Sequence, residues 1–197
     1  MAHAWRRGCG WTRYGDTMIR NPQNDRALSA AHRIVVCPGF YDPITNGHVD
    51  VITRATALFD EVVVAVVSHS VRKSATLFSL AERLDFIGAA TAHLERVRAE
   101  PVDALVVEFA RSIGATAIVK GLRAISDFEY ELEMNQLNRQ QAPEIESVYI
   151  MASPEFSFVS SSGVKELATF DGQIEGLVHP VVARRLQKEL SRSYLAE

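Results

Sequence analysis

Four short polar segments of this sequence carry residue types that suit the binding of phosphate groups. The first reads Thr45-Asn46-Gly47-His48 and lies where a helix is predicted to begin. A helix start offers unpaired N–H groups and the positive end of the helix dipole, and both favour phosphate. Gly47 permits close approach of the backbone, and His48 can donate a hydrogen bond to a phosphoryl oxygen. The segment is neither a P-loop nor the Gly-x-Gly-x-x-Gly of dinucleotide-binding sites, and a simple helix cap is the competing interpretation.

The other three segments add cations and hydroxyl groups. They are Lys120-Gly121-Leu122-Arg123, the pair Arg72-Lys73, and Ser160-Ser161-Ser162 before an apolar helical run. Taken singly, each has an ordinary structural explanation: a turn with solvated charges, a solvated pair, or a helix N-cap. Brought to one place by the fold, the four segments would form a polyphosphate-binding site.

The elements between these segments are those of a parallel α/β sheet. Apolar, β-branched runs predict buried strands at 34–37, 62–67, 116–119 and 147–150. Helical spacing predicts helices near 46–59, 79–93, 103–113, 126–141, 161–169 and 179–191, with Gly114 and Pro143 as stop signals. The alternation predicts a doubly wound parallel sheet with helices on both faces, in one domain over residues 33–197. Ligands of such sheets bind beyond the carboxyl ends of the strands, which the polar segments follow.

Composition excludes several classes of protein. The chain has 197 residues, of which 47% are hydrophobic and 23% charged, with a net charge of −3. This mild acidity argues against a general nucleic-acid binder, and no stretch approaches the roughly 20 apolar residues of a membrane span. Two cysteines, Cys9 and Cys37, are too few for a disulfide framework or a four-cysteine zinc site. We therefore expect a reducing, cytoplasmic location.

The first 32 residues differ from the rest. They hold five Arg, no Lys and two Asp, a net charge of +3, so the remaining residues sum to −6. Residues 1–32 show no helical or alternating apolar pattern, and we expect a disordered leader. They lack the apolar centre of a secretory signal. An organelle transit peptide fits poorly, a nucleic-acid role has little support, and Met18 as the natural start stays open.

Three segments resemble the motifs of one enzyme family. Pro38-Gly39-Phe40-Tyr41-Asp42-Pro43-Ile44-Thr45-Asn46-Gly47-His48 resembles the first signature of the Thr/His-x-Gly-His nucleotidylyltransferases. The run from Lys120 to Glu131 is similar to a mark of the bacterial phosphopantetheine adenylyltransferase branch, and 158–162 is similar to that branch's second nucleotide-binding signature. Order and spacing fit along residues 33–190. The resemblance implies a Rossmann-like nucleotidylyltransferase fold.

The resemblance also implies an activity and a set of site residues. The activity is transfer of AMP from ATP to 4′-phosphopantetheine in coenzyme A biosynthesis, giving dephospho-coenzyme A and pyrophosphate by direct in-line attack, with Mg²⁺ bound through the ATP phosphates. His48 would be the catalytic residue, and no residue is implied as a metal ligand. The implied ATP-binding residues are Phe40, Tyr41, His48, Gly121, Leu122, Arg123, Glu131, Phe156, Ser157, Phe158, Val159, Ser160, Ser161 and Ser162. The implied acceptor-binding residues are Phe40, Arg72, Leu105, Val106 and Lys120. Homohexamers and feedback inhibition by coenzyme A are further family expectations.

The sequence departs from the family pattern at several points. Phe40 stands in place of a Thr or Ser, Tyr41 in place of a Phe, and Gly163 where a bulky apolar residue is usual. About two extra residues follow Lys73, so either Arg72 or Lys73 could bind the acceptor phosphate. We expect these departures to weaken or retune activity without abolishing it.

Two alternative functions stay open at this point. One is a sister nucleotidylyltransferase with another acceptor, such as nicotinate mononucleotide or a phosphorylated alcohol. The run from Lys120 to Glu131 argues against it. The other is a catalytically silent nucleotide sensor, and the joint presence of His48, Lys120 and Arg123 argues against that.

Overall fold

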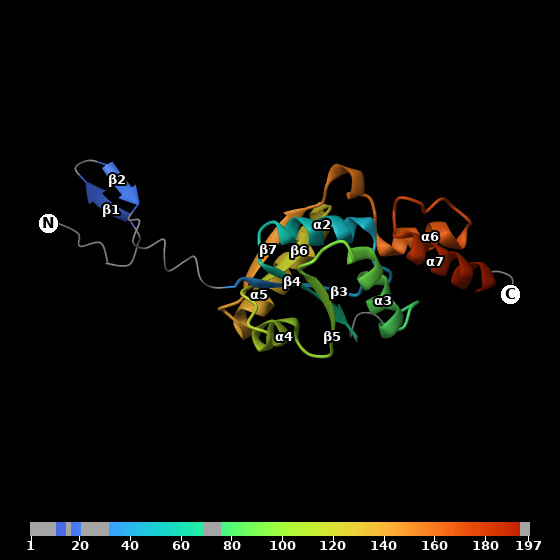
Figure 1. Ribbon diagram of the computed structural model, residues 1–197, viewed down its shortest axis with the longest axis horizontal. Helices are drawn as coiled ribbons and strands as arrows, with labels where there is room; N and C mark the ends of the chain where they lie inside the picture. The colour runs from blue at the N-terminus through green and yellow to red at the C-terminus, as the bar shows by residue number, and fades with distance from the viewer. Residues whose placement is uncertain (1–10, 15–16, 21–31, 69–75, 194–197) are drawn as a thin grey trace. The chain divides into compact units, whose positions relative to one another are not determined.

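The computed structural model describes residues 11–14, 17–20, 32–68 and 76–193 (Figure 1). Contacts divide the chain into two units, residues 1–32 and 33–197. In the first unit the elements are β1 (Trp11–Tyr14) and β2 (Thr17–Arg20). In the second they are β3 (Ile34–Gly39), α2 (Asn46–Thr56), β4 (Glu61–Val67), α3 (Leu80–Thr91), β5 (Val97–Val102), α4 (Val106–Ser112), β6 (Ala117–Leu122), α5 (Ile125–Gln141), β7 (Glu146–Met151), the 3₁₀ turn η1 (Pro154–Phe156), α6 (Ser161–Thr169) and α7 (Pro180–Ser193).

The second unit is built on a five-stranded parallel sheet with the order β5-β4-β3-β6-β7. The predicted strands correspond to β3, β4, β6 and β7. The continuous burial along β3 and β4 is that of strands covered on both faces, as in doubly wound sheets. Successive residues face opposite sides: Val35 belongs to one apolar cluster and Val36 to the other. The predicted fold class is confirmed.

Helices cover both faces of this sheet. The larger cluster joins one face to α2, α3, α6 and α7, and the smaller joins the other face to α4. In Figure 1, α2 lies on one side of the sheet and α4 on the other. The α4 helix ends at the predicted stop, where Gly114 has a φ of 69° that glycine adopts at little cost.

The sheet opens at the boundary between β3 and β6. These strands pair only at Val35 with Ala117 and at Val36 with Ile118, although β3 continues to Gly39 and β6 to Leu122. The order of strand addition reverses here, since β4 and β5 extend the sheet on one side of β3 and β6 and β7 extend it on the other. Such a switch point leaves a crevice at the carboxyl ends of the two strands.

One strand of the sheet was not among the predicted ones. β5 lies at the edge, carries Arg98 and Glu100, and contains Pro101. Both charged side chains are partly exposed, and an edge strand tolerates proline because one row of its hydrogen-bonding groups has no partner strand. The charged residues and the proline of β5 do not indicate a strand in the sequence. Its pairing with β4 in the structure shows that it is one.

The described residues of the first unit form two short strands. β1 pairs antiparallel with β2, with Trp11 opposite Arg20 and Tyr14 opposite Thr17. The signal available in the sequence was a pair of short β-prone runs separated by Gly15-Asp16, a residue pair common in two-residue hairpin connections. Among the described residues of the whole chain, no helix is long and apolar enough to cross a membrane.

Candidate active site

His48 is held at the start of α2 by a reciprocal hydrogen-bonded cap. The backbone N–H of Thr45 donates to His48 Nδ1 at 3.0 Å, and the His48 N–H donates to Thr45 Oγ1 at 3.4 Å. A ring nitrogen that accepts a backbone N–H carries no proton, so the proton of the neutral imidazole lies on Nε2. The cap thus presents His48 as a hydrogen-bond donor through Nε2.

Tyr41 supports this histidine from the core. Its ring meets the His48 ring edge-on, with centroids 5.1 Å apart, and its hydroxyl donates to the Cys37 carbonyl at 2.9 Å. Burial raises the pKa of the Tyr41 hydroxyl well above its ordinary value, with a smaller contribution from Cys37. Tyr41 also has a φ of 50°, which is uncommon for a residue with a side chain. The Tyr41 side chain therefore packs in the core against His48.

Asp42 joins three segments around the crevice. Its carboxylate accepts the N–H groups of Leu77 and Phe78 at 3.0 Å each and the Lys165 ammonium at 2.9 Å. Burial by itself would raise the pKa of Asp42, but these hydrogen bonds and the Lys165 charge hold it below its ordinary value. Asp42 is thus an anion that fixes the segment after β3 to the start of α3 and to α6.

Arg123 connects two of the predicted phosphate-binding segments. It forms a two-pronged pair with Asp127, through Nε at 3.1 Å and Nη2 at 3.3 Å, and Nη1 donates to the Val159 carbonyl at 3.0 Å. Burial would raise the pKa of Asp127, and the bonds from Arg123 lower it below its ordinary value. These contacts orient the guanidinium and use three of its five N–H donors.

Lys120 and Glu131 lie together beside the same crevice. The Lys120 ammonium is 3.1 Å from Glu131 Oε1, and both side chains are partly exposed. The next residue, Gly121, leaves room for α2, because a Cβ there would lie 2.9 Å from Val51. The glycine is therefore needed for close packing of α2 on β6, whatever its part in nucleotide binding.

The serine cluster at the start of α6 performs the structural work of a helix cap. Ser160 Oγ accepts the Gly163 N–H at 3.0 Å, and the Ser161 hydroxyl donates to the Pro43 carbonyl at 2.8 Å. Ser162 is exposed. The first N–H groups of a helix have no partner inside it, so those of α6 can meet phosphate oxygens in addition.

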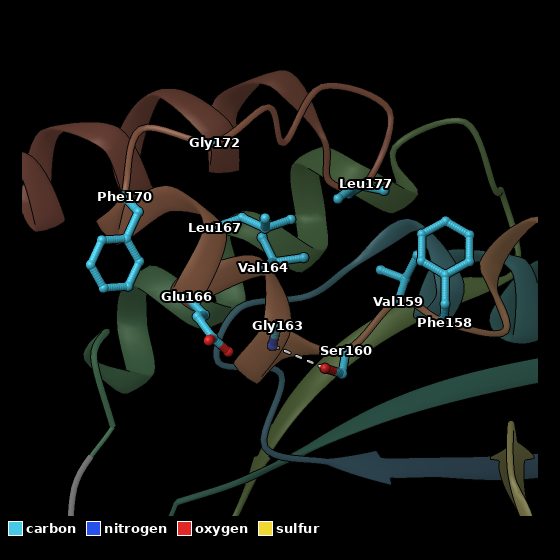
Figure 2. Close-up of a pocket in the computed structure, with 10 residues that line it drawn as sticks. All are labelled: Phe158, Val159, Ser160, Gly163, Val164, Glu166, Leu167, Phe170, Gly172 and Leu177. Carbon is cyan, nitrogen blue, oxygen red and sulfur yellow. Dashed lines mark hydrogen bonds between the residues drawn. The ribbon is translucent and has the colours of Figure 1, made fainter.

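A pocket of about 480 Å³ adjoins this cluster. Figure 2 shows Phe158 and Val159 near one end of the group of lining side chains and Phe170 near the other, with the Ser160–Gly163 hydrogen bond between them. The lining residues are Phe158, Val159, Ser160, Gly163, Val164, Glu166, Leu167, Phe170, Gly172 and Leu177. The only charge in this lining is the carboxylate of Glu166, so the pocket does not suit a triphosphate. The cations that could bind a triphosphate lie at the end of β6, toward the crevice between β3 and β6.

The remaining predicted site residues are placed as follows. Phe40 directly follows β3 and its carbonyl accepts a hydrogen bond from Arg83. Leu105 immediately precedes α4 beyond β5 and is 54% exposed, while Val106 is the first residue of α4. Leu122 is buried at the end of β6. Phe156 ends η1, Ser157 follows it and is exposed, and Arg72 and Lys73 lie outside the described residues.

Comparison with known proteins identifies the family. The cytidylyltransferase-like family model matches residues 36–167. The phosphopantetheine adenylyltransferase of Rubrobacter xylanophilus is 51% identical over 160 residues, which cover 81% of this chain and 96% of the relative. Those of Desulfitobacterium hafniense (strain Y51) and Thermodesulfovibrio yellowstonii are each 46% identical over 157 residues, covering 80% of this chain and 95% and 97% of the relatives. The chain belongs to the phosphopantetheine adenylyltransferase family.

This phosphopantetheine adenylyltransferase family member is therefore a nucleotidyltransferase, and solved structures agree with it in fold. A nicotinic acid mononucleotide adenylyltransferase from Plasmodium falciparum, complexed with NaAD, aligns with a TM-score of 0.60 at 14% identity. The alignment covers 80% of this chain and 96% of that one. The crystal structure of a protein from Vibrio parahaemolyticus aligns with a TM-score of 0.58, also at 14% identity, over 82% of this chain and 96% of that one. At this identity the likeness concerns the fold alone.

Three residues of this adenylyltransferase that organise the site had no role in the sequence-based prediction. Asp42 lies inside the first motif, and its position before Pro43 was a usable signal. Lys165 lies four residues after Ser161, one helical turn into α6, which was a weaker one. Arg83 gave no signal, because an arginine on an amphipathic helix usually extends into solvent.

Proposed function

We propose that this protein transfers AMP from ATP to 4′-phosphopantetheine, giving dephospho-coenzyme A and pyrophosphate. The observation that carries the proposal is the set of contacts that gathers His48, Arg123 and the start of α6 around the β3–β6 crevice. The names of the relatives supply the acceptor. A phosphate oxygen of the acceptor forms a bond to the α-phosphorus of ATP, while the bond from that phosphorus to the bridging oxygen breaks and its electron pair leaves with pyrophosphate.

His48 is suited to the charge that develops in this step. Negative charge grows on the α-phosphoryl oxygens as the new bond forms, and a donor fixed in advance stabilises that charge without reorganisation. The contact between Thr45 and His48 Nδ1 fixes the ring and leaves the proton on Nε2. No protein nucleophile is required, because such transfers depend on positioning and charge stabilisation.

The other predicted residues divide between the two substrates. Arg123 and the start of α6 would hold the β- and γ-phosphates, while Gly121, Leu122, Glu131 and residues 156–159 would frame the nucleotide. Lys120 and either Arg72 or Lys73 would bind the acceptor phosphate, with Leu105 and Val106 along the pantetheine arm. Among the described residues no three His, Cys, Asp or Glu side chains gather as a metal site. We propose that Mg²⁺ would be held through the ATP phosphates rather than by protein side chains, and that it would supply charge neutralisation there.

We further propose a cytoplasmic homohexamer. Exposed apolar side chains along α5 support self-association, because a monomer rarely exposes so many on one helix. They are Ile125, Phe128, Tyr130, Leu132 and Leu137. The small number of cysteines supports the reducing location.

Pyrophosphate release tests the proposed function. The purified protein is mixed with ATP, Mg²⁺ and either 4′-phosphopantetheine or nicotinate mononucleotide. We expect release with the first acceptor only. Release with nicotinate mononucleotide alone would identify a sister enzyme, and silence with both in a preparation that binds ATP would indicate a sensor. Light scattering on the same sample measures the mass expected of six chains.

Phe40→Thr should raise kcat/KM about tenfold. A hydroxyl at this position could reach a substrate phosphate, and one hydrogen bond to a charged group accounts for such a factor. Steady-state kinetics measure the change, with Phe40→Ala as the control that removes the ring without adding a hydroxyl. An equal gain in both variants, or none in Phe40→Thr, would show that the hydroxyl does not matter.

A further inference from the structure

Arg83 is a buried cation beneath the carboxyl ends of β3 and β4. It lies on α3 and is 2% exposed. Its Nη1 donates to two backbone carbonyls, that of Phe40 at 2.8 Å and that of Val67 at 3.0 Å. Val67 is the last residue of β4, and Phe40 is the first residue after β3. One nitrogen atom therefore joins the carboxyl ends of two neighbouring strands through its two hydrogen bonds.

A buried guanidinium carries a large desolvation penalty for a residue whose role is only to join two strands. Burial lowers the pKa of the Arg83 guanidinium, and the charge of Asp42 opposes that shift only in part. Asp42 itself makes its ion pair with Lys165. Arg83 Nε is buried and has no hydrogen-bond partner among the described residues. A methionine would fill a similar volume without the desolvation penalty, so stability alone does not explain an arginine here.

The position of the Phe40 carbonyl governs that of His48. The chain from Tyr41 to Thr45 is buried throughout. Because its close-packed side chains leave little room to adjust, a shift at one end of this segment moves the other end as well. Its far end is the Thr45–His48 cap, and its middle is tied to Ser161 through the Pro43 carbonyl. A shift at Phe40 would therefore move His48 relative to the start of α6.

We propose that Arg83 is a positioning residue for AMP transfer, which holds the Phe40 carbonyl on the end of β4 and so keeps His48 in register with the α-phosphate. This inference rests on the proposed function. It concerns alignment of bound substrates, and it leaves their separate affinities unchanged. A displacement of about 1 Å in such a site can cost about 100-fold in rate.

Two substitutions and one matched control test the proposal. Arg83→Met removes both hydrogen bonds. Arg83→Lys can keep them, because both come from a single nitrogen that an ammonium can replace. Arg96→Met is the control: Arg96 also donates to a backbone carbonyl, that of Thr56 at 3.1 Å, but it does so at the opposite end of the sheet and is exposed.

We expect Arg83→Met to lower kcat about 100-fold with the KM for ATP within about threefold of the parent value, Arg83→Lys to recover most of the loss, and Arg96→Met to change neither. Circular dichroism confirms that each variant is folded. A folded Arg83→Met with kcat within threefold of the parent would overturn the proposal. So would an equal loss in Arg83→Lys, or a loss confined to KM.

Hydrogen exchange of the peptide covering residues 40–48 gives a second readout that does not need turnover. Arg83→Met should speed exchange in this peptide, while Arg83→Lys and Arg96→Met should not. If the parent protein transfers no AMP, the proposed function fails, and unchanged exchange would then overturn the positioning role of Arg83 as well. If the parent is active, the kinetic ratios decide the role of Arg83 alone.

Discussion

His48→Ala should lower kcat by roughly 10²- to 10³-fold while changing the affinity for ATP by less than about threefold. The imidazole Nε2–H is worth most where charge develops in the transition state, and it contributes little to binding of the ground state. Steady-state kinetics give kcat, and equilibrium binding of ATP in the absence of acceptor gives the affinity.

His48→Gln separates catalysis from helix capping. Alanine also removes the acceptor of the Thr45 N–H, and the loss of a cap costs about 1 kcal/mol of stability. Glutamine at this position of a capping box can accept the same N–H. We expect His48→Gln to regain the stability that His48→Ala loses and to remain slow. Turnover within a few-fold of the parent in either variant would contradict the role of His48 at the transition state.

Asp42→Asn should lower the free energy of unfolding at pH 7 by about 3 kcal/mol. The substitution leaves Lys165 without its buried partner and removes one carboxylate oxygen from the N–H groups of Leu77 and Phe78. Urea unfolding measures the change. Asp60→Asn is the control, because the ion pair of Asp60 with Arg33 is exposed and such pairs contribute at most about 1 kcal/mol.

The contribution of Asp42 should also vanish in acid. The pKa of Asp42 is lowered from 3.8 in the folded protein, so the stability it provides is complete above about pH 3.8. It is lost as the pH falls through the folded-state value. The difference in unfolding free energy between the parent and Asp42→Asn should therefore shrink below pH 3.8. A difference that is equal at pH 7 and pH 3 would show that the charge is not its source.

The sequence allowed a good part of the fold to be predicted and a smaller part of the site. β4 was evident because a strand buried on both faces must be apolar throughout, whereas the charged edge strand β5 obeys no such requirement. For the site, glycine, cation and hydroxyl patterns located the segments. They could not tell which of the three serine hydroxyls caps α6, which is that of Ser160, or that the Tyr41 ring lies in the core. Those facts depend on side-chain direction, which spacing along the chain does not determine.

Arg83 shows why part of the site could not be predicted from the sequence. Its spacing on α3 is that of any charged residue on an amphipathic helix. Its burial follows only from the way the ends of β3 and β4 meet above it. Asp42 is similar, since its partners lie 35 and 123 residues further along the chain. Local patterns carry no information on contacts at that separation.

The buried Cys37 of β3 is closed to thiol chemistry. Cys37 is fully enclosed in β3 below Tyr41, and burial raises the pKa of its thiol to about 12, with Lys120 opposing the rise. The reactive thiolate is therefore almost absent at physiological pH. Oxidants and alkylating drugs should leave this cysteine untouched in the folded protein, so a covalent inhibitor of the site would need a different anchor.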